Sequence, residues 1–249
     1  PTDNEIVVPV SGGKDSTATL ILALQHFDKD KILPLHCNTG WDHPKTYEYL
    51  DYMEQMSGIK INHTKYEEAP TMPDLIRRIG KFPNRVMRVC TARYKETATT
   101  RWYKKNGFYE DRKGQVWLGI RSDESHQRKK KYGDLDSNDV HNYRDIFPWI
   151  PKRMDKNVSL RFPVIDWSTQ DCFDLIKEYG WKRNPLYDEG SNRVGCYPCL
   201  LATKKKQKEE FNTEFGQKQL KFIRDLEKEL NIKYEMYDED QGSCEVCNI

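Results

Sequence analysis

Residues 11–16 form a short segment whose backbone and side chains could bind an anion. The segment reads Ser-Gly-Gly-Lys-Asp-Ser and stands between two apolar stretches, residues 6–10 and 18–27. We expect a strand before it and a helix after it, so that adjacent glycines make a tight turn whose amides face one point. The helix would add unpaired N–H groups and the positive end of its dipole, a common setting for bound phosphate. The residues expected to hold phosphate in this glycine loop are Ser11, Gly12, Gly13, Lys14, Asp15 and Ser16.

The spacing within the glycine loop excludes two common nucleotide motifs. Its glycines are adjacent and Asp15 follows the lysine, whereas a Walker A loop needs G-x-x-x-x-G-K-[ST] and a dinucleotide fold needs G-x-G-x-x-G. Asp15 has two interpretations, as a residue that places Mg²⁺ or as a cap of the following helix. The plain structural alternative is a glycine turn that only starts a helix.

The cysteines are the second group of residues suited to chemistry. The chain has seven, and four of them stand in two Cys-x-x-Cys pairs, at 196–199 and 244–247. An odd number without a secretory signal argues against a disulfide framework and for a reducing compartment. One zinc ion held by both pairs and a redox-active dithiol at 244–247 are two interpretations of this pattern. Cys37 and Cys172 stand outside the pairs, and we expect them to be structural.

Composition sets the class of protein. A chain of 249 residues, 32% charged and 37% hydrophobic, is long enough for one large α/β domain or for one domain with an appendage. The net charge of +2 argues neither for nor against a nucleic-acid partner. No apolar run is long enough to span a membrane and no signal-like segment is present, so we expect a cytoplasmic protein without a membrane partner.

The order of the expected elements predicts which loops meet. Residues 32–36 and 59–63 read as strands, with a helix between them that starts at Pro44 and ends at Gly58. The order strand–helix–strand–helix–strand predicts a doubly wound, mainly parallel α/β sheet. Ligands of such sheets bind beyond the carboxyl ends of the strands, so the turn at 37–41 is expected beside the glycine loop.

Later segments add charge near the same edge. Residues 115–119 read as a strand, and Arg121 after it is suited to clamp phosphate or sulfate, or else to pair with a neighbouring acid. Arg93 is a second clamp or a charge on a helix surface. Between 126 and 160 the pattern dissolves into basic runs with Gly, Asp and Ser, which predicts an exposed, partly mobile insertion. This insertion is either a solvated face, or a flexible basic lid or nucleic-acid contact in which Tyr143 and Trp149 are the expected stacking groups.

Regular structure resumes after residue 160. Ser168, with Asp171 three residues later, predicts a capped helix, and residues 213–230 predict a long amphipathic one. We therefore divide the chain into a nucleotide-binding domain, residues 1–200, and a helical, cysteine-containing extension, residues 201–249.

Several of these segments resemble one protein family. Ser-Gly-Gly-Lys-Asp-Ser is similar to the PP-loop of the ATP pyrophosphatases and sulfonucleotide reductases. Residues 38–40, Asn-Thr-Gly, resemble the Asp-Thr-Gly turn of the phosphoadenosine phosphosulfate (PAPS) reductase family, and residues 118–125 resemble its Gly-x-Arg-x-x-Glu-Ser segment. Residues 163–167 and 184–199 match later blocks in the family's order. The resemblance implies an adenine-nucleotide α-hydrolase-like (Rossmann-like) fold in which the nucleotide-binding residues beyond the glycine loop are Asn38, Thr39, Gly40, Arg93, Arg121, Glu124 and Ser125.

The resemblance leaves three functions open. Reductases of the family commonly replace the loop lysine, whereas Lys14 is present here, as in the ATP-cleaving members, which include tRNA sulfur-inserting enzymes and DndC-like DNA phosphorothioation proteins. The first expectation is therefore ATP-dependent adenylation with Mg²⁺, releasing AMP and pyrophosphate and coupled to sulfur transfer. The second is a PAPS or adenylylsulfate (APS) reductase, although residues 243–249 lack the glycine and histidine of the Glu-Cys-Gly-x-His tail of PAPS reductases. The third is a zinc-stabilised, non-catalytic nucleotide-binding module. The residues expected to be catalytic in one branch or the other are Lys14, Asp15, Arg121, Cys244 and Cys247.

The family also suggests a use for the cysteines. In the iron–sulfur APS reductases a Cys-Cys pair precedes a similar arginine, and a later Cys-x-x-Cys completes four ligands; Val89 replaces the first of them here. The resemblance implies a [4Fe–4S] cluster, with one iron either bound by a fourth cysteine or left open, as in some tRNA-thiolating enzymes, where it can hold an extra sulfide. The implied ligands are Cys90, Cys196 and Cys199, with Cys244 or Cys247 as the fourth.

The expected partners follow from the same resemblance. They are an adenine nucleotide, and either a nucleic-acid acceptor or a sulfur-donor or thioredoxin-like protein. The sequence is compatible with a homo-oligomer.

Overall fold

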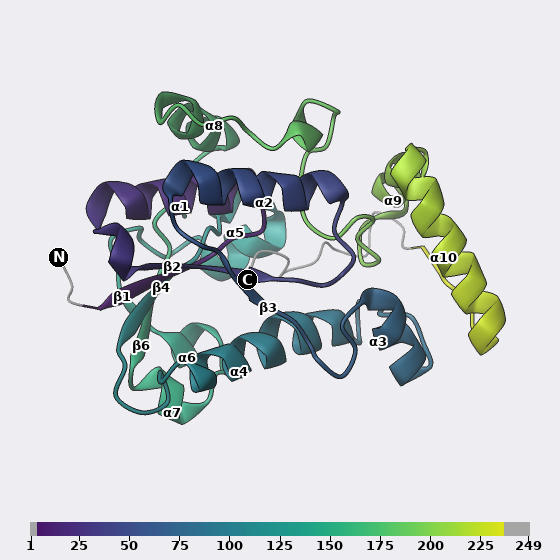
Figure 1. Cartoon of the computed structure of the whole chain (residues 1–249), viewed down its shortest axis with the longest axis horizontal. Coiled ribbons are helices and arrows are strands. Elements are labelled where there is room, and N and C mark those ends of the chain that lie inside the picture. The colour runs from purple at the N-terminus through teal and green to yellow at the C-terminus, as the bar shows by residue number, and fades with distance from the viewer. Residues whose placement is uncertain (1–3, 237–249) are drawn as a thin grey trace.

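The computed structural model describes residues 4–236, which form a six-stranded sheet with helices on both faces (Figure 1). The strands are β1 (Glu5–Pro9), β2 (Ile32–Cys37), β3 (Asn62–Thr64), β4 (Gly114–Trp117), β5 (His141–Asn142) and β6 (Val158–Arg161). Their order is β3-β2-β1-β4-β6-β5, and every pairing is parallel except that of β5 with β6. The expected doubly wound α/β sheet is thus confirmed. Because the winding reverses between β1 and β4, the loops that follow these strands meet at one edge.

Two helical layers cover the sheet. One face carries α1 (Lys14–His26), α2 (Pro44–Ser57) and α8 (Thr169–Glu178), and the other carries α4 (Ala98–Lys105), α6 (Tyr143–Ile146) and α7 (Lys152–Asp155) (Figure 1). Side chains alternate along β1, as the strand period requires. Ile6 and Val8 pack with residues of α1 and α2, whereas Val7 packs in a second core with Tyr103 and Phe108.

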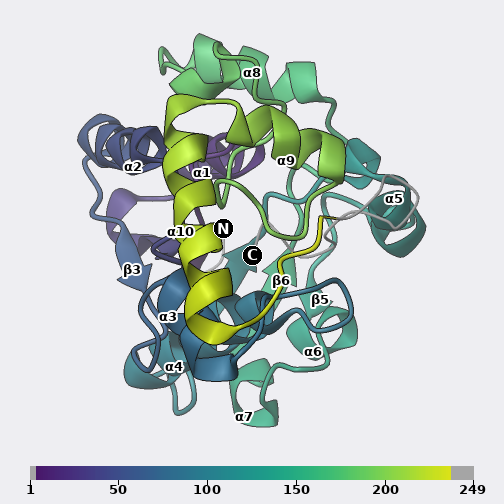
Figure 2. The same ribbon diagram turned by 90° about the vertical axis from the view of Figure 1, so that its right-hand side faces the viewer.

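The C-terminal helices extend one end of the molecule. Helices α9 (Lys204–Phe211) and α10 (Glu214–Leu230) lie beside α3 (Met72–Ile79) and close a third core, which contains Leu75, Phe211 and Ile223 (Figure 2). A bidentate ion pair between Arg77 and Glu229 also joins α3 to α10. The expected long helix therefore forms, preceded by a short helix that the sequence reasoning did not identify.

Local signals explain where these helices begin and end. Ser168 and Asp171 form a reciprocal capping box before α8, as expected. Pro44 is the first residue of α2, and Gly58 ends this helix in the left-handed conformation, with φ of 71°. Shorter elements complete the chain: α5 (His126–Tyr132), a π-helical turn (Thr91–Thr97) and the 3₁₀ turns Lys29–Lys31, Ser122–Glu124 and Pro185–Tyr187.

The segment from 126 to 160 differs from the expected exposed insertion. It contributes β5 and β6 to the sheet, and its apolar side chains enter the core. Tyr143, expected as an accessible stacking group, is 1% exposed, and Met154 is fully buried. The sequence reasoning failed because the apolar residues here are spread over a two-residue strand and short helices, which have no long period.

Two further results concern the limits of the chain. The terminal Cys-x-x-Cys pair, Cys244 and Cys247, lies outside the described residues. Within residues 4–236, the helices are too short or too polar for any of them to cross a bilayer.

Candidate functional site

The glycine loop lies between β1 and α1, as expected. Gly12 has a φ of +72°, a conformation that side-chain-bearing residues rarely adopt, and α1 begins at Lys14. The Ser16 hydroxyl donates to the Gly13 carbonyl at 3.0 Å and accepts from the Ser11 amide at 3.2 Å. These bonds hold the turn in place at the positive end of a 13-residue helix.

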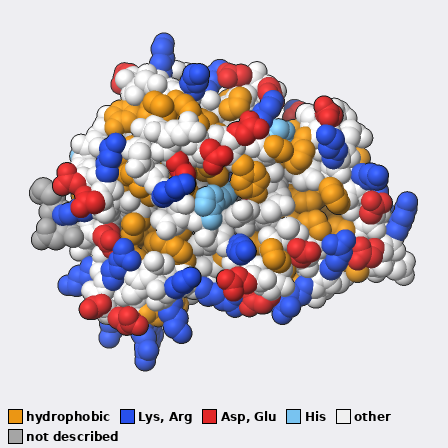
Figure 3. Space-filling model, viewed as in Figure 1, with side chains coloured by type: hydrophobic (Ala, Val, Ile, Leu, Met, Phe, Trp, Pro, Cys, Tyr) orange, Lys and Arg blue, Asp and Glu red, His pale blue; other side chains and the backbone are white. Residues whose placement is uncertain are grey.

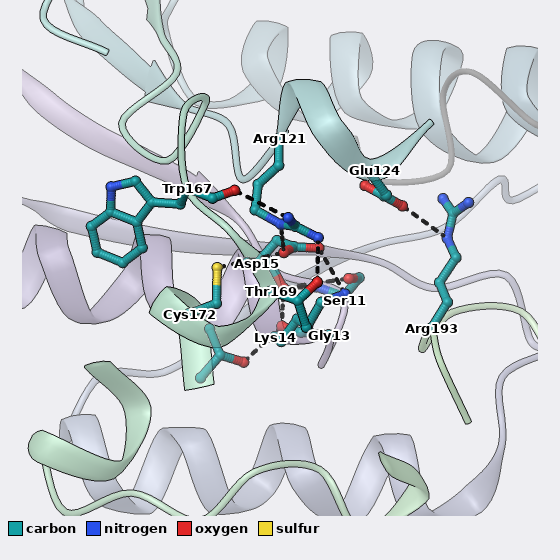
Figure 4. Close-up of polar contacts among 12 residues, drawn as sticks. Ser11, Gly13, Lys14, Asp15, Arg121, Glu124, Trp167, Thr169, Cys172 and Arg193 are labelled. Carbon is teal, nitrogen blue, oxygen red and sulfur yellow. Dashed lines mark hydrogen bonds and ion pairs between the residues drawn. The ribbon is translucent and has the colours of Figure 1, made fainter. Parts of the chain in front are cut away.

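Asp15 and Arg121 form a buried ion pair behind the glycine loop (Figure 4). The Arg121 Nε donates to Asp15 Oδ1 at 2.5 Å, and the two residues are 2% and 4% exposed. Nη1 of Arg121 donates to the Trp167 carbonyl at 3.1 Å, and Nη2 donates to Thr169 at 2.9 Å. Burial lowers the pKa of Arg121, but the charge of Asp15 outweighs it and leaves that pKa above its ordinary value. Arg121 is therefore held by protein acceptors, and its contacts fix Asp15 and the first turn of α1.

Lys14 is covered by the 3₁₀ turn Pro185–Tyr187. Its backbone N–H donates to the Tyr187 hydroxyl at 2.9 Å, and its Nζ lies 5.7 Å from the Tyr187 ring and 3.5 Å from Asp15. The Asn184 side chain donates to the Gly12 carbonyl at 3.1 Å. Asn184 and Tyr187 thus hold the loop, a role that sequence reasoning missed because nothing in a turn sequence shows what the turn covers.

Gly119 explains how closely β4 approaches the glycine loop. A Cβ at this position would lie 2.8 Å from the Asp15 carbonyl oxygen and 2.9 Å from the Ser16 Cα. Both are backbone atoms, which cannot move aside as a flexible side chain could. Only glycine therefore lets the end of β4 pack against the loop.

Glu124 contacts two arginines, and Figure 4 shows its contact with Arg193. It pairs with Arg128, and its other oxygen lies 3.5 Å from Arg193. Arg128 is 2% exposed, and its Nη2 has no hydrogen-bond partner within residues 4–236. Burial, together with the neighbouring Arg193, lowers the pKa of Arg128. The Nη2 of Arg128 is thus a buried donor without a partner in this part of the chain, which suits an anionic ligand.

The remaining residues expected at the site are spread more widely. The Asn38 side chain accepts from the Gly40 amide at 2.8 Å, and the Ser125 hydroxyl caps α5 by accepting from the Arg128 amide. Thr39 donates to Asp42 at 3.0 Å. Arg93 is exposed and lies over the ring of Tyr66 at 5.7 Å.

A cavity of about 180 Å³ joins the glycine loop to the cysteines. Pro9, Val10 and Ser11, at the end of β1 and the start of the loop, form part of its lining. Its other polar and sulfur-containing residues are His36, Cys37, Thr39, Asp42, Cys90, Thr91, Lys95, Arg193, Cys196, Cys199, Thr203 and Lys206. The fold thus brings Cys90, Cys196 and Cys199 to one space, which we call the cysteine cavity.

The four cysteines that line the cysteine cavity are half-buried. Burial raises the pKa of Cys90 to about 11, and it also raises the pKa of Cys196, which lies near Asp42. Burial lowers the pKa of Lys95, which lies near Cys196 and Cys37. Within the described part of the chain, no three His, Cys, Asp or Glu side chains are placed to hold a single metal ion. The three cysteines therefore share a cavity without forming a ready site for one ion.

A family model decides where the chain belongs. The phosphoadenosine phosphosulfate reductase domain model matches residues 5–202, which include the glycine loop, Arg121 and the Cys196–Cys199 pair. The chain belongs to this family. The glycine loop described above, residues 11–16, is the segment in which the PP-loop of this family was expected, and nucleotide binding by these residues stays a prediction.

Relatives within the family include named enzymes. An uncharacterized 37.8 kDa protein of Escherichia phage 186 is 29% identical, over 82% of this chain and 70% of its own length. The phosphoadenosine 5'-phosphosulfate reductase of Erwinia tasmaniensis is 22% identical, over 72% of this chain and 64% of the enzyme. Subunit 2 of the sulfate adenylyltransferase of Shigella dysenteriae is 28% identical, over 73% of this chain and 59% of that subunit. This chain therefore spans less than two thirds of either named enzyme.

Solved structures agree on the fold. The PAPS reductase of Candida auris, in a phosphate complex, superposes with a TM-score of 0.56 at 14% identity, over 80% of this chain and 84% of the enzyme. The FMN adenylyltransferase of Candida glabrata, with FAD and pyrophosphate, gives a TM-score of 0.52 at 12% identity, over 82% of this chain and 61% of its own. Both comparisons bear on the adenine-nucleotide α-hydrolase-like fold, which is confirmed.

Proposed function

We propose that this PP-loop protein binds ATP with Mg²⁺ and couples adenylation of an acceptor to sulfur transfer. The observation that supports this most directly is the cysteine cavity, whose wall includes both the start of the PP-loop and three cysteines. A sulfur species in this space lies next to the place where the loop would hold the nucleotide. Neither a simple nucleotide-binding module nor a hydrolase needs that arrangement.

The chemistry rests on positioning and charge neutralisation. The amides at the start of α1 and Lys14 would hold the phosphates, and the unpartnered Nη2 of Arg128, with Arg193, would take up further negative charge. An acceptor oxygen then attacks the α-phosphate, and pyrophosphate leaves. A sulfur nucleophile displaces AMP from the activated acceptor in a second step. Asp15 contributes by fixing the loop through Arg121, and its carboxylate remains a candidate for placing Mg²⁺.

The cysteines fit a cluster better than a single ion. Cys90, Cys196 and Cys199 line one cavity of about 180 Å³, yet no three candidate ligands within residues 4–236 converge on one point. Thiolates that surround a space suit a [4Fe–4S] cluster, whose ligands bind separate irons. Such a cluster would supply an iron at which sulfur can be held. A zinc ion held by Cys196, Cys199, Cys244 and Cys247 depends on residues outside the described chain.

The alternative function is a sulfonucleotide reductase that releases sulfite. The identity with the Erwinia reductase favours it, and Cys244 or Cys247 would be the nucleophile. A thioredoxin-like protein would then be the partner, whereas the sulfur-transfer proposal calls for a nucleic-acid or small-molecule acceptor. The face seen in Figure 3 carries acidic and basic side chains intermixed, so a nucleic-acid acceptor gains no support from that face.

Calorimetric binding to anaerobically purified protein separates the two functions, since it needs neither an acceptor nor a partner. ATP with Mg²⁺ should bind more tightly than PAPS or APS, and the reverse order would make the protein a reductase. Lys14→Ala should weaken ATP binding by about 10- to 100-fold, because hydrogen bonds to charged groups contribute about 1.5–3 kcal/mol. Lys60→Ala is the control, since the Lys60 side chain is 93% exposed. Equal effects of both variants would refute the loop assignment.

A further inference from the structure

The hydroxyl of Tyr187 occupies the first amide of α1. This helix begins at Lys14, whose N–H donates to the Tyr187 oxygen at 2.9 Å. A Cβ on Gly13 would lie 3.5 Å from the same oxygen, so the hydroxyl lies directly against the glycine loop. Anions at a helix N-terminus bind to amides of this kind. While Tyr187 accepts from Lys14, however, a phosphate oxygen cannot use that amide.

The turn that carries Tyr187 is attached to the glycine loop and to α8. Asn184 is 1% exposed; its Nδ2 donates to the Gly12 carbonyl at 3.1 Å, and its Oδ1 accepts from the Leu186 amide at 3.0 Å. The Tyr187 ring packs edge to face on the ring of Phe173, with centroids 5.2 Å apart. These contacts hold the hydroxyl at the loop from two sides.

The proton of this hydroxyl is available to a ligand. A phenol oxygen both accepts and donates hydrogen bonds. The Lys14 amide uses an acceptor position, and no group within residues 4–236 is placed to accept the phenol proton. Burial raises the pKa of Tyr187, and the carboxylates of Asp15 and Glu124 raise it further. The phenol therefore keeps its proton at neutral pH and remains a donor.

Two cationic side chains lie near the same donor. The Lys14 Nζ is 5.7 Å from the centroid of the Tyr187 ring. Arg128 is 2% exposed, and its Nη2 has no hydrogen-bond partner within residues 4–236. The charges of Glu124 and Asp15 act on Arg128 as they act on Tyr187, so both donors face the same two carboxylates. A ligand that meets these donors must be an anion with several acceptor oxygens, which describes a phosphate group.

We infer that the Tyr187 hydroxyl donates a hydrogen bond to a phosphate oxygen of the bound nucleotide, in the place of the Lys14 amide. The Lys14 N–H donates to the phenol oxygen and the phenol O–H donates to the phosphate, so that the positive end of α1 acts on the ligand through the hydroxyl. This inference rests on the part of the proposed function in which the glycine loop binds a nucleotide. It gives Tyr187 a role in binding besides its role in holding the loop.

The first test is ¹³C NMR of the full chain, purified anaerobically and labelled at the tyrosine Cζ. The sample is titrated with ATP and Mg²⁺ and, separately, with PAPS. Tyr187→Phe and Tyr52→Phe identify the two signals by their loss. The Cζ resonance of a phenol moves downfield when its O–H donates to an anion. We expect the Tyr187 signal to move downfield saturably with the nucleotide that binds, and the Tyr52 signal to stay in place.

Calorimetric binding of the same nucleotide to Tyr187→Phe measures what the hydroxyl contributes. The variant keeps the ring and its contact with Phe173 but lacks the donor. Its affinity should fall about 3- to 10-fold, since the released Lys14 amide replaces only part of the lost hydrogen bond. Tyr52→Phe is the matched control, because the Tyr52 hydroxyl also accepts from a backbone amide of this segment, that of Lys182, at 2.8 Å. Its hydroxyl has no hydrogen bond to residues 11–16, so the control should bind as the wild type does.

Each outcome bears on one proposal or the other. A Tyr187 signal that stays in place while a nucleotide binds overturns the inference, and so do equal affinities of Tyr187→Phe and Tyr52→Phe. Tighter binding by Tyr187→Phe also overturns it, since the hydroxyl would then compete with phosphate for the Lys14 amide. If PAPS binds in preference to ATP and moves the Tyr187 signal, the proposed function fails and the inference stands. If neither nucleotide binds, both fail.

Discussion

Replacing Arg121 tests whether this residue supports the PP-loop or serves as a ligand clamp. Arg121→Met keeps much of the side-chain volume but leaves the Asp15 carboxylate buried without the guanidinium whose Nε donates to it. Removing one partner of a buried pair costs about 3–5 kcal/mol. Asp15 retains Lys14, 3.5 Å away, so we expect the lower end, about 3 kcal/mol. For a chain of this length, that loss lowers the melting temperature by about 6–12 °C.

The assay is equilibrium unfolding in urea, with the melting temperature as a second measure. Arg101→Met is the matched control, because Arg101 donates to both oxygens of Glu68 at 2.7 Å, but the two side chains are 51% and 36% exposed. Exposed pairs contribute about 0–1 kcal/mol. Adding Asp15→Asn to Arg121→Met should restore part of the lost stability, since it removes the uncompensated charge. If Arg121→Met and Arg101→Met cost the same, the reasoning is refuted and Arg121 is available to a ligand.

Three further predictions follow from the same contacts. Gly119→Ala should lower the free energy of unfolding by about 1–3 kcal/mol and weaken ATP binding, because the new Cβ would lie 2.8 Å from the Asp15 backbone. Gly195→Ala is the control and should be nearly neutral, since a Cβ there has no atom within 4 Å. Urea unfolding of both variants measures the difference. Burial lowers the pKa of His36 in the folded state, so below pH 6.5 the unfolded chain takes up a proton at this residue and the folded chain does not. The free energy of unfolding of the wild type should therefore fall by up to about 1.4 kcal/mol per pH unit more than that of His36→Asn. Parallel slopes for the two proteins in urea unfolding from pH 7 to 5 would contradict this. In metal-free protein, Cys90 should resist iodoacetamide at pH 8 and react as the pH approaches about 11, because burial raises its pKa to about 11 and only the thiolate reacts. Rapid alkylation of Cys90 at pH 8, located by mass spectrometry, would show an exposed thiolate instead.

The parts of the fold that were predictable from sequence are those set by neighbouring residues. The glycine turn, the proline that starts α2 and the Ser168 capping box each depend on a few consecutive positions, and each lies where it was expected. The parallel sheet followed from the order of elements alone. Such signals are local, so tertiary contacts did not override them.

The site was less predictable, because its chemistry depends on contacts between distant segments. Arg121 was expected at the loop, but a sequence cannot show that Asp15, Trp167 and Thr169 occupy its guanidinium. His36 went unnoticed, since a single histidine in an apolar strand has no motif around it. The strand β6 was missed because its four residues alternate too briefly to be told from a loop.

The cysteine cavity can form only late in the synthesis of the chain. Its thiols come from Cys37, Cys90, Cys196 and Cys199, so roughly a hundred residues must be translated between the second and the third. At about 5–20 residues per second, the early thiols wait about 5–20 s before the last wall emerges from the ribosome. During this interval the thiols of Cys37 and Cys90 are unprotected from oxidants and metal ions. The cysteine cavity forms only when the segment that carries Cys196 and Cys199 folds against them. The cysteine cavity is thus complete only after the segment that carries Cys196 and Cys199 has been translated.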